Sequence, residues 1–142
     1  MAVRKADAVW EGKLKDGKGK MRSESGKLDS EFNAKTRFDN EAGTNPEELL
    51  GAAYAGCFSM ALSHLLGEAG YNPKHIHTTA EVHLEAVNNG FEIQLIELNT
   101  EGRVPDIDED TFKKYAAEAK DNCPVSQALT GVKKELKSRL LN

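Results

Sequence analysis

The sequence predicts an α+β protein, because strand-like segments come first and helices are inserted between later extended segments. One observation behind this is a long apolar segment with helix start and stop signals at its ends. Another is a pair of extended segments joined by a strong turn sequence. The third is the amphipathic pattern of a further helix. These features occupy residues 45–69, 75–104 and 108–122.

The first 38 residues are predicted to be β-structure. Ala2–Glu11 alternates weakly between apolar and polar residues, and the glycines that follow it mark turns. Phe32–Phe38 is a second, shorter extended candidate. The polar segment 39–44 is expected to be a loop before the first long helix.

The clearest predicted helix covers residues 45–69. Asn45 can cap its start, Pro46 suits its first position, and Glu48 completes an Asn-x-x-Glu capping box. Gly70 is placed to end it. After its acidic first turn the helix carries no charge until Glu68, so this part is apolar nearly all round. We therefore expect it to be buried in the middle of the fold.

The rest of the chain supplies the remaining elements. His75–Val87 and Phe91–Val104 are predicted to be strands, and the Asn-Asn-Gly turn between them is a strong hairpin signal. Asp108–Asn122 has an acidic first turn and one apolar side, which is typical of a surface helix. A short helix can begin at Pro124. The tail, 132–142, fits either a frayed helix or an edge strand.

Composition narrows the classes of function. A chain of 142 residues predicts one domain over 1–142, and 39% hydrophobic with 30% charged residues is typical of a globular protein. The net charge of −4 with no basic block argues against nucleic-acid binding. We expect no membrane partner and a cytoplasmic location, because no apolar run reaches the length of a span and the first residues lack a signal peptide.

The two cysteines, Cys57 and Cys123, are the most suggestive residues. In a reducing compartment they are either two inert buried thiols or a redox pair. Cys57 lies in the centre of the apolar helix, where desolvation disfavours a thiolate, so a packed core thiol is the simpler interpretation. Cys123 precedes Pro124 near the start of a helix, where the dipole favours a thiolate. A capping or packing role for Cys123 stays open.

Two charged residues could act on Cys57. Glu47 is not needed for the capping box if Glu48 serves there, although an ordinary acidic first turn also explains it. Arg37 could point inward from an extended segment, or it could be exposed. His75 and His77 share one face of a predicted strand, but no further ligand has suitable spacing. We therefore expect neither a metal nor a cofactor.

Two sequence blocks resemble the OsmC/Ohr superfamily, and they occur in the family's order. The first is Thr44-Asn-Pro-Glu-Glu-Leu-Leu-Gly-Ala-Ala-Tyr-Ala-Gly-Cys57-Phe-Ser-Met-Ala-Leu62, which is similar to the helix that carries the peroxidatic cysteine. The second, Cys123-Pro-Val-Ser-Gln127, is similar to the second-cysteine motif. Arg37 stands in an Asn-Thr-Arg-Phe-like segment shortly before the helix, which resembles the OsmC branch.

The resemblance implies a thiol-dependent peroxidase that reduces organic hydroperoxides, and hydrogen peroxide less readily, in protection against oxidative or osmotic stress. Cys57 would be the peroxidatic cysteine and Cys123 the resolving one. Arg37 would favour the Cys57 thiolate, and Glu47 would orient Arg37. The cycle would pass through a sulfenic acid and a Cys57–Cys123 disulfide, which an external dithiol such as a lipoyl group would reduce.

The implied architecture is a single OsmC-like domain in an intertwined homodimer, with antiparallel sheets around two central helices and an active site at each subunit boundary. The chain departs from the family at Gly56, where alanine is more common, and in its charged tail. A different class of function remains open, namely a non-catalytic small-molecule-binding or redox-sensing OsmC-like protein. The reactivity of the Cys57 thiol would distinguish the two.

Overall fold

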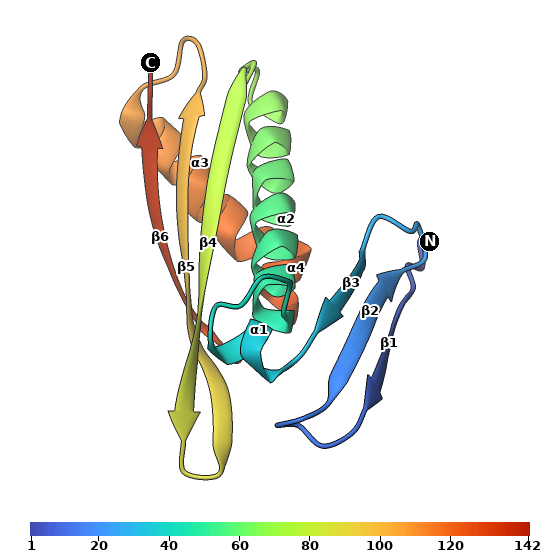
Figure 1. Cartoon of the computed structure of the whole chain (residues 1–142). Helices are drawn as coiled ribbons and strands as arrows, with labels where there is room; N and C mark the ends of the chain where they lie inside the picture. Colours follow the sequence, from blue (N-terminus) through green and yellow to red (C-terminus); the bar gives the residue numbers. More distant parts are fainter. The chain divides into compact units, whose positions relative to one another are not determined.

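The computed structural model describes residues 1–142, which divide into two compact units, Met1–Leu49 and Leu50–Asn142. Each unit contains its own three-stranded sheet, and the elements are labelled in Figure 1. The division falls near the start of the long helix.

The sheet of the N-terminal unit is an antiparallel meander in the order β1-β2-β3. Its strands are β1 (Ala6–Glu11), β2 (Lys18–Ser23) and β3 (Asp29–Phe32). Gly19 on β2 pairs with Trp10 on one side and Phe32 on the other, and the two rings meet with centroids 5.4 Å apart. A Cβ at Gly19 would lie 2.6 Å from atoms of both rings. Glycine therefore lets the two aromatic side chains pack across the sheet.

The prediction that Phe32–Phe38 is extended is wrong beyond Phe32, because residues Ala34–Phe38 form a short helix, α1. Asn33 begins it with a complete capping box. The Asn33 side chain accepts from the Thr36 N–H, and the Thr36 hydroxyl oxygen accepts from the Asn33 N–H. Local capping thus overrides the strand pattern, and Arg37 comes from a helix.

The long helix, α2 (Pro46–Glu68), matches its predicted limits. Asn45 Oδ1 accepts the Glu48 N–H at 2.8 Å, as expected of a cap. The other half of the predicted capping box is not formed, because the Glu48 carboxylate accepts from the Thr44 hydroxyl instead, at 3.1 Å. Gly70, with φ of 91°, follows the helix in the left-handed conformation that glycine favours.

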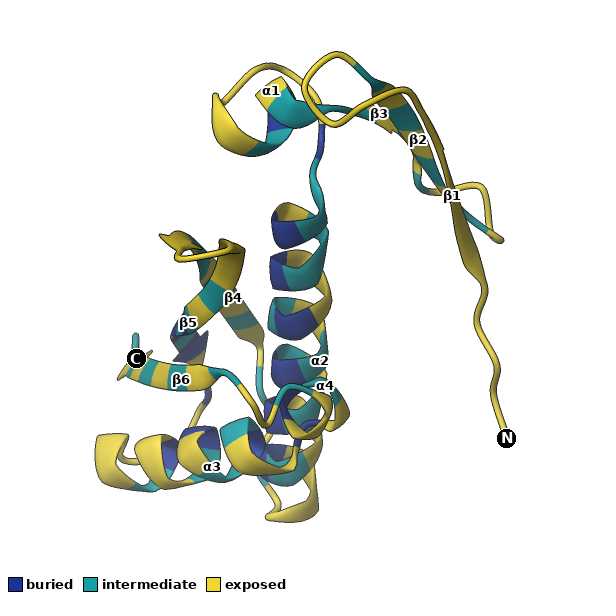
Figure 2. Ribbon diagram, turned by 90° about the horizontal axis from the view of Figure 1, so that it is seen from below, coloured by how far each residue is buried: buried dark blue, intermediate teal, exposed yellow.

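Only one face of α2 is buried in the single chain, whereas the sequence predicts a helix in the middle of the fold. Tyr54, Phe58, Leu62 and Leu66 are fully buried along one side. The opposite side is exposed, and in Figure 2 the colour of α2 changes around its axis. That exposed side carries mainly small or apolar residues, namely Ala52, Ala53, Gly56, Met60, Ser63, His64 and Gly67. By length and composition alone, α2 could also cross a membrane.

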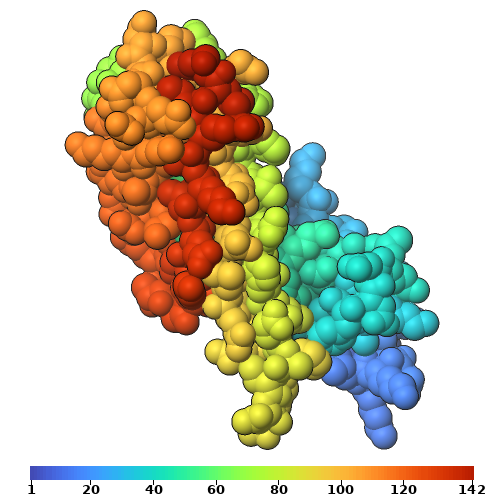
Figure 3. Space-filling view, turned by 90° about the vertical axis from the view of Figure 1, so that its left-hand side faces the viewer, coloured from blue at the N-terminus to red at the C-terminus, as the bar shows by residue number.

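The sheet of the C-terminal unit has the order β4-β5-β6. The strands β4 (His75–Val87) and β5 (Gly90–Arg103) form the predicted antiparallel hairpin. The tail is an edge strand, β6 (Lys133–Leu140), which runs parallel to β5. Figure 3 shows the end of the β4–β5 hairpin projecting past β6, since β6 pairs only with residues 95–102 of β5.

The remaining helices are α3 (Glu109–Asn122), capped by Asp108, and the five-residue α4 (Pro124–Ala128). The core of this unit lies where α2 and α3 pack on the sheet (Figure 1). Gly51 allows close packing there, because a Cβ would lie 3.3 Å from the Val82 side chain on β4. The buried residues are Tyr54, Phe58, Leu62, Leu66, Ile96, Leu98, Val104, Ile107, Phe112, Ala116, Ala119 and Cys123.

Candidate functional site

The structure brings the two cysteines into contact. Cys57 lies in the middle of α2 and Cys123 lies between α3 and α4, 66 residues later. Their Sγ atoms are 2.8 Å apart, with Cys123 as the donor, and both thiols are free. Cys123 is fully buried and Cys57 is half-buried. Two sulfurs at this separation can form a disulfide with little movement.

The backbone around Cys123 is held by both neighbouring helices. Its N–H donates to Ala119 O at 2.9 Å, which ends α3, and its carbonyl accepts from Gln127 N at 3.0 Å in α4. Cys123 is thus the C-cap residue of α3 and the N-cap residue of α4. Pro124 suits the first position of α4, because the N–H that it lacks would have no partner within the helix. The thiol is fixed by two helix ends rather than by a mobile loop.

Burial raises the pKa of the Cys123 thiol, and its hydrogen bond to Cys57 raises it further. Backbone N–H groups of Ser126 and Val125 act in the opposite direction and are outweighed. The expectation that the helix start favours a Cys123 thiolate is therefore wrong, because desolvation dominates. Cys123 stays protonated and can donate its hydrogen to the sulfur of Cys57.

A second contact lies one helical turn from the sulfurs. The Tyr54 hydroxyl on α2 donates to Ser126 Oγ on α4 at 2.9 Å, and both residues are buried. Burial raises the pKa of Tyr54, so it remains a neutral donor. Neither residue was singled out in the sequence. Their spacing from the cysteines could have indicated them, because Tyr54 is three residues before Cys57 and Ser126 is three residues after Cys123.

Arg37 and Glu47 form the second predicted pair, within the N-terminal unit. Arg37 Nε donates to both carboxylate oxygens of Glu47 at 3.1 Å, and Nη2 donates to Oε1 at 2.6 Å. The Glu47 side chain is only 9% exposed and that of Arg37 is 32% exposed. Forked pairing of this kind holds a guanidinium in one orientation. The simpler interpretation of Glu47 as an ordinary first-turn carboxylate does not account for its burial.

A pocket of about 300 Å³ opens beside Arg37 in the same unit. Its lining is mostly apolar and aromatic, and the Arg37 side chain forms part of the wall. Such a pocket suits a molecule with an apolar body and a polar end. The lining residues are Trp10, Leu14, Phe32, Asn33, Ala34, Arg37 and Pro46.

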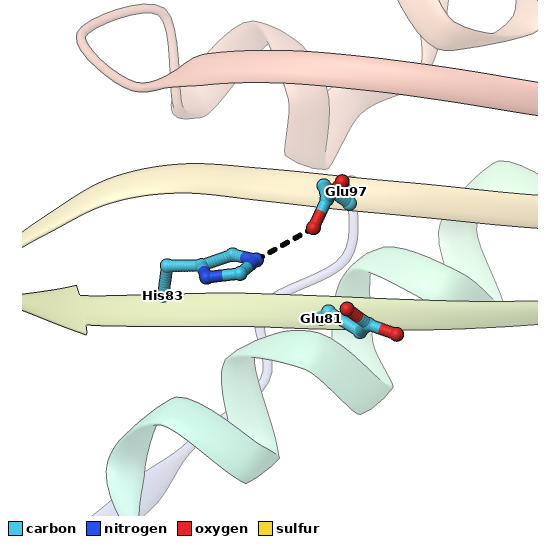
Figure 4. A group of neighbouring side chains, drawn as sticks. All are labelled: Glu81, His83 and Glu97. Carbon is cyan, nitrogen blue, oxygen red and sulfur yellow. Dashed lines mark hydrogen bonds and ion pairs between the residues drawn. The ribbon is translucent and has the colours of Figure 1, made fainter.

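The side chains of Glu81, His83 and Glu97 have nitrogen and oxygen atoms within 4.8 Å of one another, which is close enough to hold a metal ion. Figure 4 shows His83 on β4 facing Glu97 on β5, with Glu81 beside them. His83 Nε2 lies 2.7 Å from Glu97 Oε2, so these two groups already satisfy each other. His75 and His77, which share a strand face but were not expected to bind a metal, are not part of this group. Glu81 is exposed, whereas His83 and Glu97 are half-buried. The group includes neither cysteine, and nothing in the thiol chemistry requires it.

The chain is similar to known proteins over most of its length. The family model described as OsmC-like protein matches residues 38–137. Peroxiredoxin OsmC of Escherichia coli strain K12 is 54% identical over 127 residues, covering 89% of each chain. Organic hydroperoxide resistance protein OhrB of Bacillus subtilis strain 168 is 33% identical over 127 residues, covering 84% of this chain and 89% of the relative.

Solved structures share the fold. The crystal structure of the organic hydroperoxide resistance protein OhrB of Bacillus subtilis superposes with a TM-score of 0.69 at 27% identity, covering 96% of this chain and 97% of that one. The mixed α+β architecture is therefore confirmed. The chain belongs to the OsmC family, and its enzyme class is that of a peroxidase.

Proposed function

We propose that the protein reduces organic hydroperoxides to alcohols, and hydrogen peroxide less well, through a cycle of its two cysteines. The observation that carries this proposal is the contact between Cys57 Sγ and Cys123 Sγ at 2.8 Å. Inert structural thiols need no partner thiol, whereas a peroxidatic and a resolving cysteine must meet. The names of the relatives from Escherichia coli and Bacillus subtilis support the same substrate class.

The first chemical step falls to Cys57. Its thiolate attacks one peroxide oxygen, the O–O bond breaks, and the leaving alkoxide takes a proton to become the alcohol. Cys57 is thereby oxidised to a sulfenic acid. Cys123, which burial keeps protonated, then attacks that sulfur. An S–S bond forms, and the sulfenic hydroxyl leaves as water with the Cys123 proton. An external dithiol, such as a lipoyl group, reduces the disulfide by exchange.

In this proposal Arg37 stabilises the thiolate, and Glu47 orients Arg37. The forked pair supports these roles because it fixes the direction of the guanidinium. The apolar pocket beside Arg37 supports a preference for organic substrates, whose carbon chains gain from leaving water. No cofactor or metal has a role in the cycle.

The proposal includes a cytoplasmic homodimer in which each active site is completed at the subunit boundary. The exposed side of α2 supports it, because small residues let a second helix approach closely. Met60, which is 76% exposed, would be covered there. The apolar composition of α2 is then that of a central core helix rather than a membrane span.

The test is the decay of cumene hydroperoxide with dithiothreitol as reductant. Wild-type protein should consume the peroxide over many turnovers. Cys57→Ser should abolish consumption, whereas Cys123→Ser should be slowed, or inactivated as its sulfenic acid oxidises further. Peroxide consumption by Cys57→Ser at the wild-type rate, or none by the wild type, would overturn the proposal. The second outcome would favour a binding role.

A further inference from the structure

We propose that the hydrogen bond between Tyr54 and Ser126 positions the resolving cysteine, so that these two residues set the rate of disulfide formation. The inference rests on the proposed function and concerns only its second step. It assigns no bond-making role to either residue. Both would act through the placement of Cys123 relative to Cys57.

The residues of the two contacts have matching spacings on two helices. Tyr54 and Cys57 are three residues apart on α2, so their side chains lie on the same side of that helix, one turn apart. Cys123 and Ser126 are likewise three residues apart at the start of α4. The two contacts pair Tyr54 with Ser126 and Cys57 with Cys123. The Tyr54–Ser126 bond adds a second point of contact between α4 and α2, one turn from the two sulfurs.

The helix that carries Ser126 needs such an attachment. With five residues, α4 is too short to be stable on its own hydrogen bonds. Tyr54 bonds the Ser126 side chain, and one side chain from another element bonds backbone carbonyls at the end of α4. Lys134 Nζ on β6 donates to Leu129 O at 2.7 Å and to Ser126 O at 3.3 Å. The Lys134 hydrogen bonds link α4 to the sheet, and the Tyr54 hydrogen bond links α4 to α2, the helix that carries Cys57. Only the second attachment bears directly on the distance between the sulfurs.

The chemistry of the second step makes orientation decisive. The Cys123 sulfur must approach the Cys57 sulfur in line with the S–O bond that breaks, and water leaves with the Cys123 proton. Because Cys123 is buried and its pKa is raised, the step gains little from a pre-formed thiolate. The protein can then accelerate disulfide formation mainly by placing the Cys123 sulfur correctly relative to the Cys57 sulfur.

The test separates placement from folding stability with the variants Tyr54→Phe, Ser126→Ala and the double variant. Each single variant leaves one buried hydroxyl without its partner and should lower stability. The double variant removes both hydroxyls and should recover most of that loss. If the bond positions Cys123, all three should form the disulfide about five- to ten-fold more slowly than wild type, which is the factor expected from ~1 to 1.4 kcal/mol.

The rate is read in a single turnover with one equivalent of cumene hydroperoxide. Dimedone traps the Cys57 sulfenic acid before the disulfide forms, so the trapped fraction should rise in the three variants. The rate of the first peroxide reaction should not change. Tyr71→Phe is the matched control, because Tyr71 is a tyrosine of the same unit that packs on the Tyr115 ring, while its hydroxyl makes no side-chain hydrogen bond like that of Tyr54. In Tyr71→Phe, the fraction of Cys57 sulfenic acid that dimedone traps should equal that of the wild type.

Each outcome decides the inference. Slow disulfide formation in the double variant, with stability close to wild type, supports positioning. Disulfide formation at the wild-type rate in that variant overturns it, even if the single variants are slow, because their slowness then reflects instability. Failure of wild-type protein to consume the peroxide overturns the proposed function itself and this inference with it.

Discussion

Replacing Arg37 by lysine keeps the positive charge but removes the forked hydrogen bonds between the guanidinium and the Glu47 carboxylate. In the structure, Nε and Nη2 of Arg37 donate three hydrogen bonds to the Glu47 carboxylate, at 3.1, 3.1 and 2.6 Å. A lysine ammonium can reach that carboxylate as a single point of charge, without a fixed plane. The variant therefore loses at least one charge-assisted hydrogen bond to a carboxylate that is 9% exposed.

The size of the effect follows from that loss. A hydrogen bond to a charged group contributes about 1.5 to 3 kcal/mol, and the 32% exposure of the Arg37 side chain reduces this to about 1 to 2 kcal/mol. If the orientation of the cation matters for the peroxide reaction, kcat/KM for cumene hydroperoxide should fall about five- to thirty-fold. The assay is peroxide decay at saturating dithiothreitol, with substrate far below KM.

Arg22→Lys is the matched control for this prediction. Arg22 pairs with Asp7 at 3.0 Å in the same unit, but both side chains are more than half exposed. Its replacement should leave kcat/KM within about two-fold of wild type, since exposed pairs contribute little. Wild-type activity in Arg37→Lys would refute the argument that a fixed fork is needed. An equal loss in Arg22→Lys would show that the effect is not specific to Arg37.

Three further outcomes are expected. Met60→Glu should convert the proposed dimer to monomer on a sizing column, because it places a charge where α2 would pack against its copy; an unchanged elution volume would argue against that interface. In Cys57→Ser protein, Cys123 should alkylate with a pH midpoint above that of an ordinary thiol, since burial raises its pKa; a midpoint at or below the ordinary one would contradict this. Asp108→Ala should destabilise the protein at neutral pH but not in strong acid. The backbone N–H of Thr111 lowers the pKa of Asp108, so its stabilisation is present above the ordinary carboxyl pKa and lost as pH falls through the lowered one; urea denaturation at both pH values checks this.

Local sequence signals determined most of the long elements. The limits of α2, the β4–β5 hairpin and the helix after Asp108 follow from caps, a proline, a turn sequence and periodicity, all of which act over a few residues. The same signals failed at Phe32–Phe38, where the Asn33 capping box produced a helix. The tail was ambiguous because an edge strand depends on its partner, and only pairing with β5 makes β6 a strand.

The sequence also named Cys57, Cys123, Arg37 and Glu47 through the resemblance of two motifs, but it could not show which of them meet. Contacts between residues 66 positions apart depend on the tertiary fold, because nothing in the local sequence fixes where the chain returns. Only the structure could show that Cys123 is buried and stays protonated, since desolvation there outweighs the helix start that the sequence displays. The Tyr54–Ser126 bond also emerged only there, because a hydrogen bond between α2 and α4 exists only once both helices are packed.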